Sequence, residues 1–423
     1  MSTATTEPTQ PPSGFAEPEQ LTLGDAARAY GQKVRGGDVG SLPAIAGLIV
    51  LVAVFAALKQ DTFTNSFNVA NLINQSAAVI VIAMGLVFVL LLGEIDLSAG
   101  YTAGVCAAVM GIVMTNHGVA WPIALLACLA TGAVIGTVLG WLVAYLGIPS
   151  FVVTLAAFLG LQGLLLQLIG EGGTIAYRDD TILAVMNKNL PVWLGWTLFL
   201  VLVVLYAGLT FRRSVARRAA GLAGDPLAVW ATKTLALVIV VGAAVAYLST
   251  ERSKNPQLTS LKGVPIVVAV LVALLIVTTF ALNRTSWGRH VYAVGGNAEA
   301  ARRAGINVAA VKLSCFMICS TLAAIAGVLL ASRDNSVSPT TGGSQTLLYA
   351  VGAAVIGGTS LFGGKGRTLD AIIGGLVIAV IDNGMSLLNQ SAGNVYMVTG
   401  AVLLIAASVD ALSRRRAAAT GRG

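Results

Sequence analysis

The sequence predicts an all-α, polytopic membrane protein with about 10–12 transmembrane helices, some of them short or broken, and with both termini in the cytoplasm. Hydrophobic residues make up 56% of the 423 residues, and charged residues make up 10%, against roughly 25% in a typical soluble domain. The apolar residues also lie in long uncharged runs, which need the bilayer as their solvent. The length of the chain therefore indicates the number of membrane spans rather than the number of globular domains.

Residues 1–40 predict a cytoplasmic N-terminal tail. Residues 1–20 contain neither the basic nor the apolar region of a secretory signal, and their Thr, Pro and Glu content is typical of a disordered segment. Residues 21–37 place Arg28 and Lys33 beside apolar residues, a pattern that fits either an amphipathic helix on the membrane surface or a plain linker.

The spans follow in order as apolar runs, because crossing the hydrocarbon core requires about 20 residues of helix. The candidates are residues 43–59, 71–93, 99–116, 119–147, 150–170, 193–211, 227–249, 264–282, 311–332, 346–359, 368–389 and 394–412. Glycine recurs every four residues in the fourth candidate, at Gly132, Gly136 and Gly140, which favours close packing of this helix on a neighbour.

Lysine and arginine in short loops assign the two faces, because such loops stay in the cytoplasm. Basic clusters follow the sixth, eighth and last candidates. They contain Arg212, Arg213, Arg217, Arg218, Arg284, Arg289, Arg302, Arg303, Lys312, Arg414, Arg415 and Arg416. An even number of spans separates these clusters, so all three fall on one face. We therefore predict a transmembrane domain at 41–412, a cytoplasmic loop at 283–312 and a basic cytoplasmic tail at 413–423.

The opposite face receives a loop of mixed sign that contains Glu171 and Asp179. The loop around Arg252, Lys254 and Lys262 falls on the same face, although it is more basic than an outer loop should be. The net charge of +8 is mostly this loop bias, so no nucleic-acid partner is indicated.

Two glycine-rich stretches resemble each other: GEIDLSAG at 93–100 and GGTSLFGG at 357–364. Glycine, leucine and glycine recur at the same offsets in both. Transporters are often built from duplicated halves with broken helices at matching positions, so the match fits a duplication as well as chance. A phosphate-binding loop would need Ser or Thr after Lys365, where this chain has Gly366. No nucleotide site is therefore predicted in this chain.

Placing a polar side chain inside a membrane span costs free energy, so each such residue is a candidate for a functional role. The candidates for a solute pathway are Asn74, Gln75, Glu94, Asp96, Gln162, Asn383 and Tyr396, with Gln167 and Asp382 as further members of the pool. Amides and aromatic rings suit hydroxyl-rich ligands, but the same amides also join helices to each other. Cys315 and Cys319 lie one helical turn apart without a histidine or carboxylate beside them, so neither a metal site nor a cofactor is predicted. No paired nucleophile and base indicates a catalytic site either.

The stretch GGNAEAARRAGINV at 295–308 predicts a short capped helix on the cytoplasmic side. Asn297 is a favoured N-cap, and Glu299 and Arg302 place opposite charges at the two ends, where they complement the helix dipole. Gly305 can end the helix in a left-handed conformation. Because a helix this short is unstable alone, it must pack on something, either a loop of the chain itself or a partner protein.

The stretch WGRHVYAVGGNAEAARRAGINV at 287–308 resembles the cytoplasmic loop of sugar ABC importer permeases of the ribose and xylose class. The resemblance continues through GEIDLSAG and through AVIGGTSLFGGKGRTLDAIIGGLVIAVI at 354–381, and it covers most of the chain from about residue 71 to 412. It implies a permease in the bacterial inner membrane, with cytoplasmic ABC ATPase subunits, an extracytoplasmic sugar-binding protein and a second permease copy as partners. The resemblance also implies that the helix at 295–308 is a coupling helix that seats in a cleft of the ATPase. The family's coupling motif falls on Gly295, Gly296, Asn297, Glu299, Ala300, Ala301, Arg302, Gly305 and Ile306.

Two segments exceed the shorter ribose-type pattern, the N-terminal tail and residues from about 171 to 262. They make the longer xylose-type permeases the closer match, so xylose or a related sugar is the expected solute. The alternative is a gradient-driven secondary transporter of a small polar solute that uses intramembrane carboxylates such as Glu94, Asp96 and Asp382.

Overall fold

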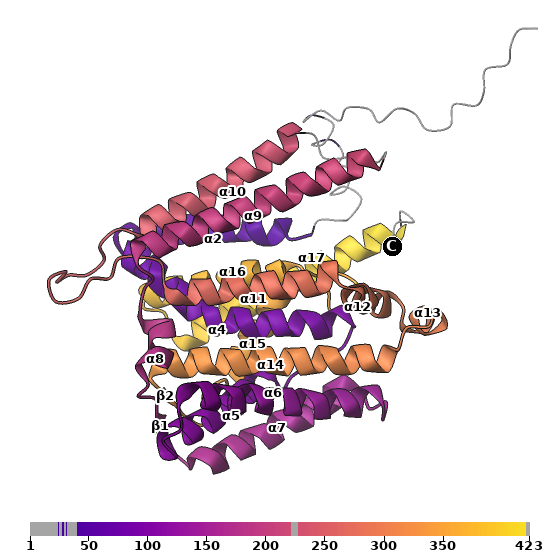
Figure 1. The fold of residues 1–423 in the computed structure, drawn as a ribbon, viewed down its shortest axis with the longest axis horizontal. Coiled ribbons are helices and arrows are strands. Elements are labelled where there is room, and N and C mark those ends of the chain that lie inside the picture. The colour runs from indigo at the N-terminus through magenta and orange to yellow at the C-terminus, as the bar shows by residue number, and fades with distance from the viewer. Residues whose placement is uncertain (1–23, 25–27, 29–30, 32–39, 221–226, 420–423) are drawn as a thin grey trace, which may run out of the picture. The chain divides into compact units, whose positions relative to one another are not determined.

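The computed structural model describes residues 24, 28, 31, 40–220 and 227–419 (Figure 1). Within these residues, ten helices are long and apolar enough to cross a membrane, and two shorter apolar helices accompany them. The two shorter helices, Leu42–Leu58 and Ser344–Gly357, correspond to the first and tenth candidates. The all-α, polytopic fold class is confirmed. The N-terminal tail expected at 1–40 lies almost entirely outside the described residues.

The chain divides into two compact units, a smaller one that contains Trp196–Val245 and a larger one made of Gly36–Gly195 and Ala246–Gly423. The smaller unit holds most of the hairpin formed by α9 (Val192–Ala219) and α10 (Leu227–Leu248). The larger unit contains α2 (Leu42–Leu58), α3 (Gln60–Phe63), α4 (Ser66–Leu91), α5 (Ala99–Gly111), the π-helix η1 (Ile112–Asn116), α6 (Trp121–Ala144), α7 (Ser150–Ile169), β1 (Ile175–Ala176), α8 (Asp180–Asn187), α11 (Ile266–Arg284), α12 (Ser286–Gly296), α13 (Ala298–Arg303), α14 (Val308–Asp334), β2 (Ser336–Val337), α15 (Ser344–Gly357), α16 (Thr368–Leu387) and α17 (Ala392–Ala419).

Helices α4 and α14 form the centre of the larger unit. In α4, 72% of the span is buried, and in α14 the share is 67%. Both helices pack against α5, and α14 also packs along α6. The largest fully buried side chains include Phe88 on α4 and Phe316 on α14. A movement of α14 would therefore reach most of the larger unit directly.

Glycine allows α6 to lie close to α14. A Cβ atom added at Gly132 would lie 2.7 Å from the Ser320 carbonyl oxygen, and one at Gly136 would lie 2.5 Å from the Phe316 carbonyl oxygen. At Gly140 the nearest atom would be the Leu313 Cα at 2.8 Å. These distances are too short for any side chain, so the three glycines have the packing role that their spacing predicts.

The two ends of the larger unit differ in structure. Figure 1 shows β1, β2 and α8 at one end of α14, and α12 and α13 at the other. The two-residue strands pair antiparallel, with Ile175 opposite Val337. The Tyr177 hydroxyl donates to the Ala107 carbonyl at 2.7 Å, which ties this strand pair to α5 just before its π-helical turn. None of these short elements is visible in the apolar pattern of the sequence.

The basic loop between α10 and α11 uses one of its charges internally. The Arg252 guanidinium donates to the carbonyls of Leu248 and Gly263, the latter at 2.9 Å. The Glu251 carboxylate accepts from the backbone N–H groups of Ser253 and Leu261, both at 3.0 Å. These backbone hydrogen bonds lower the pKa of Glu251 to about 2. Arg252 and Glu251 therefore hold the two ends of the loop together. This structural use of Arg252 accounts for part of the excess of basic residues in a loop predicted to lie outside the cytoplasm.

Candidate functional site

Helix α13 has the capped structure that its sequence predicts. The Asn297 side chain accepts from the Ala300 N–H at 2.9 Å, and Gly305 adopts a φ of +85° beyond the other end. Glu299 forms ion pairs with Arg302 at 3.1 Å and with Arg303 at 3.2 Å. All three side chains are more than half exposed, so these pairs add little stability. Their charges face outward, where a partner protein can reach them.

Helix α12, which precedes α13, fastens it to the body of the protein. The Thr285 hydroxyl caps α12 by accepting from the Gly288 N–H at 3.0 Å, and Val291 is fully buried. The Trp287 indole N–H donates to the Ser314 hydroxyl on α14 at 2.8 Å. The sequence shows the charged helix clearly, but the apolar face of α12 was not recognised as a separate helix.

Gly295, the first residue of the coupling motif, lies at a junction of three backbones. A Cβ atom at Gly295 would lie 1.8 Å from the Leu91 carbonyl oxygen at the end of α4. It would also lie 2.9 Å from the backbone nitrogen of Gly364, in the loop between α15 and α16. The Gly364 N–H itself donates to the Leu91 carbonyl at 2.8 Å. The coupling motif and both glycine-rich stretches therefore meet at one point.

A second contact supports this junction from α12. The Tyr292 hydroxyl donates to the Gly366 carbonyl at 2.8 Å. Burial, followed by the nearby Asp370 carboxylate, raises the pKa of Tyr292. The phenol therefore stays protonated and keeps α12 joined to the α15–α16 loop.

The two matched glycine-rich stretches do not share one backbone structure. Gly93 follows α4 with a φ of +74°, whereas Gly357, its counterpart by offset, is the last residue of α15. Gly100 lies inside α5, whereas Gly364 lies in a loop with a φ of +74°. What the stretches share is position, because each follows the end of a helix and the two meet beside Gly295, where Gly363 lies against both Gly93 and Gly295.

The loop between α4 and α5 carries both candidate carboxylates. Glu94 forms an ion pair with Lys312 in the second turn of α14, and the two side chains are 16% and 23% exposed. Asp96 is fully buried, and its Oδ1 accepts from the Ser98 N–H at 2.8 Å and the Ser98 hydroxyl at 2.6 Å. Glu94 therefore contacts the start of α14, at the end of the predicted cytoplasmic loop, while Asp96 shapes the start of α5.

Two of the polar candidates, Gln75 and Asn383, meet Asn68 in a cluster of amides. Asn68 and Asn383 exchange hydrogen bonds between their side-chain amides at 2.8 and 2.9 Å, which joins α4 to α16. Asn383 also donates to the Gln75 side chain at 3.4 Å. Asn68 was missed in the sequence, although it lies two helical turns before Gln75 on the same helix. Because these amides satisfy each other, packing is their role in this conformation.

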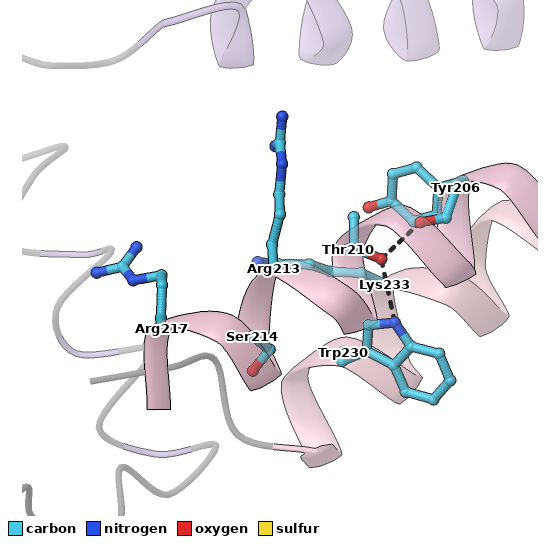
Figure 2. Close-up of a pocket in the computed structure, with 7 residues that line it drawn as sticks. All are labelled: Tyr206, Thr210, Arg213, Ser214, Arg217, Trp230 and Lys233. Atoms are coloured by element: carbon cyan, nitrogen blue, oxygen red, sulfur yellow. Dashed lines mark hydrogen bonds between the residues drawn. The ribbon is translucent and has the colours of Figure 1, made fainter. Parts of the chain in front are cut away.

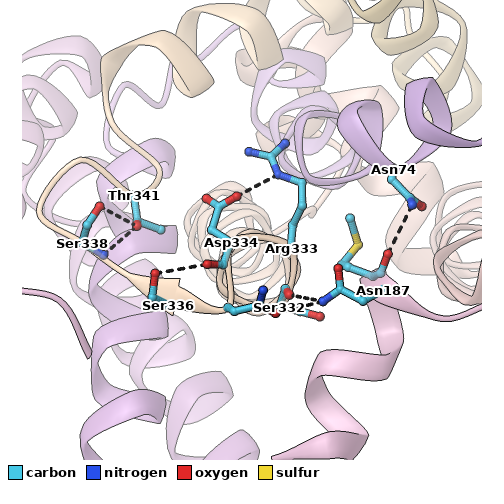
Figure 3. A network of polar contacts seen from close by, with 10 residues as sticks. Asn74, Asn187, Ser332, Arg333, Asp334, Ser336, Ser338 and Thr341 are labelled. Atoms are coloured by element: carbon cyan, nitrogen blue, oxygen red, sulfur yellow. Dashed lines mark hydrogen bonds and ion pairs between the residues drawn. The ribbon is translucent and has the colours of Figure 1, made fainter. Parts of the chain in front are cut away.

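Asn74 lies apart from that cluster, toward α8. Its amide donates to the Met186 carbonyl at 3.2 Å, beside the amide of Asn187, which donates to the Ser332 carbonyl at 2.8 Å (Figure 3). The Asn74 Oδ1 is buried and has no hydrogen-bond partner among the described residues. Figure 3 also shows Arg333 paired with Asp334, so several polar contacts lie around the end of α14.

A separate chain of hydrogen bonds joins α15, α16 and α17. The Tyr349 hydroxyl donates to Asp382 at 3.2 Å and accepts from the Gln345 amide at 3.2 Å. The Tyr396 hydroxyl donates to the Gln345 side chain at 3.1 Å. Gln162 lies on α7 and belongs to neither group. The pathway candidates therefore form several polar groups rather than one site.

The described residues contain no group of three or more His, Cys, Asp or Glu side chains that could hold a metal ion. All four cysteines are reduced and buried.

Comparison with known proteins gives one consistent result. A family described as "Branched-chain amino acid transport system / permease component" matches residues 68–407. The chain is 36% identical to the xylose transport system permease protein XylH of Escherichia coli, over 88% of this chain and 92% of that protein. It is 30% identical to the ribose import permease protein RbsC of Escherichia coli, over 86% and 91% of the two chains. It is 28% identical to the fructose import permease protein FrcC of Rhizobium meliloti, over 89% and 88%. No solved structure matches.

Proposed function

We propose, from the premise that the chain belongs to the branched-chain amino acid transport system permease family, that it is the membrane-spanning subunit of an ATP-binding-cassette importer for a monosaccharide. Xylose or a related sugar is the proposed solute, because the xylose permease is the more similar of the sugar permeases above. The observation that carries the proposal is similarity over almost the full length of several sugar permeases. The ten apolar helices of the described residues, together with the similarity to bacterial sugar permeases, support a multi-pass permease of the bacterial inner membrane.

Three partners follow from this function. ATP hydrolysis belongs to separate cytoplasmic ATPase subunits, because neither glycine-rich stretch of this chain has the pattern of a phosphate-binding loop. A sugar-binding protein delivers the solute on the opposite side of the membrane. A second copy of the permease completes the path, and a homodimer is the proposed assembly.

Helix α13 is the proposed docking element for the ATPase. Its outward face carries Glu299, Arg302 and Arg303, while Ala301 is buried against the protein. A helix of six residues has too few internal hydrogen bonds to be stable alone, so the contacts of α12 and the two caps must hold it in place. Because α13 is held in a fixed position and exposes a charged face, it can both bind the ATPase and pass the movement of the ATPase on to the permease.

The route of that force follows from the junction at Gly295. When the ATPase moves α12 and α13, the Leu91 end of α4 and the Gly364 loop must move with them, because no space separates the backbones. Lys312 carries the same movement to Glu94 through their ion pair. Through these contacts, α4, α5 and α16 would shift together and open the solute path to one side or the other.

The solute pathway is proposed to use the polar groups described above, Asn74, Gln75, Gln162, Asn383 and Tyr396, with Glu94 and Asp96 at the opposite end. Asn74 supports this role through its unpaired buried oxygen, which can accept from a sugar hydroxyl. Gln345, Tyr349 and Tyr396 add further neutral donors and acceptors, beside the Asp382 carboxylate to which Tyr349 donates. Neutral hydrogen-bonding groups of this kind fit a hydroxyl-rich solute.

Gradient-driven transport is the competing function, and buried Asp96 is the residue that would serve it. Uptake of labelled xylose into membrane vesicles separates the two functions. We expect uptake to require ATP and the sugar-binding protein, and to survive an uncoupler that dissipates ion gradients. Uptake that is lost with the uncoupler but survives ATP depletion would overturn the importer assignment.

Charge reversal on α13 tests the docking surface directly. We expect Glu299→Arg to abolish transport and co-purification of the ATPase, because it places a positive charge beside two arginines on the docking face. Gly305→Val should do the same, since a β-branched residue is strained at a φ of +85°. The same reversal at exposed Glu171, near the other end of the larger unit, is the matched control and should transport normally. Normal transport by both α13 variants would show that coupling occurs elsewhere.

A further inference from the structure

The chain between β2 and α15 runs into the membrane region without forming a helix. A Cβ atom at Gly111, near the end of α5, would lie 3.6 Å from a Val337 methyl group. The Gly342 carbonyl oxygen, in contrast, lies 2.4 Å from a Cβ atom at Gly100, at the start of α5. The helical rise between Gly111 and Gly100 is about 16 Å. Residues 338–343 therefore descend alongside α5 instead of passing over its end.

Helix α15 is consequently a half-length helix that begins inside the membrane. Its 14 residues extend for about 21 Å, which is less than the roughly 30 Å of the hydrocarbon core. Its last residue, Gly357, lies against the Asp370 backbone at the start of α16. Non-helical backbone at membrane depth is tolerated where it is buried in protein or lines a water-filled path, and broken helices often mark solute sites in transporters. The start of α15 is therefore a candidate position for such a site.

A carboxylate without a cation lies at this level. The Asp382 Oδ1, on the fourth turn of α16, accepts from the Tyr349 hydroxyl at 3.2 Å. No cation among the described residues pairs with Asp382. The side chain is only partly buried. Because an ionisable group in contact with acyl chains is costly, Asp382 is expected to face water or another protein.

Two further polar side chains extend this group to the surface. The Gln345 amide, in the first turn of α15, donates to the Tyr349 hydroxyl at 3.2 Å and accepts from the Tyr396 hydroxyl at 3.1 Å. Gln345 is exposed, and Tyr396 is 48% exposed. Thr399 follows Tyr396 by three positions on the same side of α17, and its buried hydroxyl has no hydrogen-bond partner among the described residues. The group is therefore open on the outward side of α15, α16 and α17.

The outward side of α6 shows what a lipid-facing surface of this protein looks like. Leu126, Val134 and Val138 are exposed there. The hydroxyls of Thr131 and Thr137 donate to carbonyls of their own helix, so they leave no unsatisfied donor toward lipid. The α15–α17 side differs from this surface because it carries the carboxylate of Asp382.

The pocket between α9 and α10 is another polar region within a pair of spans (Figure 2). There the Thr210 hydroxyl donates to the Tyr206 carbonyl at 2.6 Å and accepts from the Trp230 indole N–H at 3.1 Å. Arg213 and Lys233, which line the same pocket, have interaction partners as well. The polar groups of that pocket are thus occupied by contacts within the protein, whereas no cation balances Asp382.

We propose that Asp382, Gln345 and Tyr396 bind a monosaccharide on the α15–α17 side, which borders the solute path. The carboxylate accepts hydrogen bonds from sugar hydroxyls, and the Gln345 amide can both donate and accept. The exposed Tyr396 ring packs against the apolar C–H face of the sugar. This inference rests on the proposed function, since it takes a sugar as the solute, and a second permease copy facing this side would close the path.

Reaction of introduced cysteines with a charged maleimide tests whether this side meets water. Leu348→Cys, one turn from Gln345 on α15, and Val134→Cys on α6 replace residues that are 63% and 62% exposed. The four native cysteines are buried and give the background. In the full-length permease in lipid vesicles, we expect Leu348→Cys to react and Val134→Cys to be protected by lipid. Met397→Cys, beside Tyr396, is a second position on the proposed side.

Xylose is the probe for binding in the Leu348→Cys protein. We expect xylose to slow the maleimide reaction in a saturable manner. Asp382→Asn should raise the xylose concentration needed for half-protection roughly tenfold, because a hydrogen bond to a charged acceptor is stronger than one to a neutral acceptor by about that factor. Asparagine can still accept from Tyr349, so the contact between α15 and α16 is kept. Asp61→Asn, which removes an exposed carboxylate of α3, is the matched control and should leave protection unchanged.

Three results would overturn the proposal. Equal protection of the Leu348, Met397 and Val134 positions by lipid would show that the α15–α17 side faces acyl chains. Absence of protection by xylose, or protection unaffected by Asp382→Asn, would exclude a sugar site at this carboxylate. Protection by sodium chloride in place of xylose would identify a cation as the ligand. These measurements use the permease without the ATPase or the sugar-binding protein, so their failure would leave ATP-driven sugar uptake to its own test.

Discussion

Adjacent glycines at the end of α12 have opposite surroundings. A Cβ atom at Gly295 would lie 1.8 Å from the Leu91 carbonyl oxygen, whereas nothing lies within 4 Å of one at Gly296. Both belong to the coupling motif, so sequence alone gives them the same importance. The packing separates them, because only Gly295 allows the backbones of α12 and α4 to touch.

We expect Gly295→Ala to impair transport, because overpacking at this position must push α12 away from α4 at a cost of about 1–3 kcal/mol. Gly296→Ala should be neutral or slightly stabilising, since alanine is the better helix former. The measurements are sugar uptake and the ATPase activity of the assembled complex in vesicles. Gly295→Ala should reduce uptake while ATP hydrolysis continues. Equal uptake by the two variants would remove the junction from the coupling route.

Local features of single residues were well predicted where the signal lay close in sequence. The Asn297 cap and the left-handed Gly305 follow from neighbouring residues, and both are confirmed. The role of Gly295 could not be predicted, because the atoms that exclude a side chain there belong to residues distant in sequence. One is Leu91, about 200 positions earlier, and the other is Gly364. For the same reason, Asn383 was predicted as a polar candidate but its partner Asn68 was not, since the two residues are 315 positions apart.

At the scale of elements, α14 connects the coupling region to the helix-breaking loop at 92–98. Lys312, in its second turn, pairs with Glu94 of that loop. Further along, the α14 backbone at Cys319 lies against α4, where a Cβ atom at Gly85 would be 3.0 Å from the Cys319 carbonyl oxygen. The ion pair is thus the polar end of a longer contact between α14 and α4.

Charge exchange tests whether that ion pair transmits movement or only stabilises the fold. Glu94→Lys or Lys312→Glu alone places two like charges together in a partly buried position, so we expect each to lower transport strongly. The double variant should recover transport, with a coupling energy of about 1–2 kcal/mol between the two positions. The measurement is the number of sugars transported per ATP hydrolysed. If the ion pair only stabilises the fold, the folded molecules of each single variant should keep the normal ratio. Single variants that fold poorly but keep the normal ratio would assign the pair to stability alone.

The spans were predictable because each apolar run satisfies its own backbone hydrogen bonds within a helix. The elements that were missed are short: α8 has eight residues and each strand has two. Such elements depend on contacts with distant parts of the chain, as the pairing of Ile175 with Val337 shows. Apolar periodicity carries no information about those contacts.

At the scale of the whole chain, the proposal depends on which face of the membrane carries α13. The structure places α12 and α13 at the end of α14 opposite to β2 and α8, in agreement with the parity of the spans (Figure 1). The distribution of lysine and arginine then assigns the α13 end to the cytoplasm. By the charge rule, the basic loop near Arg252 is evidence against that assignment. This evidence is weaker than the residue count suggests, because the Arg252 guanidinium is hydrogen-bonded within the loop.

Cysteine accessibility in intact cells decides the orientation. All four native cysteines are buried, so the unaltered protein should react little with a membrane-impermeant maleimide and serves as the background. We expect Glu171→Cys, in the exposed loop after α7, to react from outside the cell. Lys365→Cys, in the exposed loop between α15 and α16, should react only after the membrane is permeabilised, because that loop lies beside Gly295 at the cytoplasmic end. The reverse pattern would place α13 outside the cell, where no ATPase could dock, and the importer mechanism would fail with it.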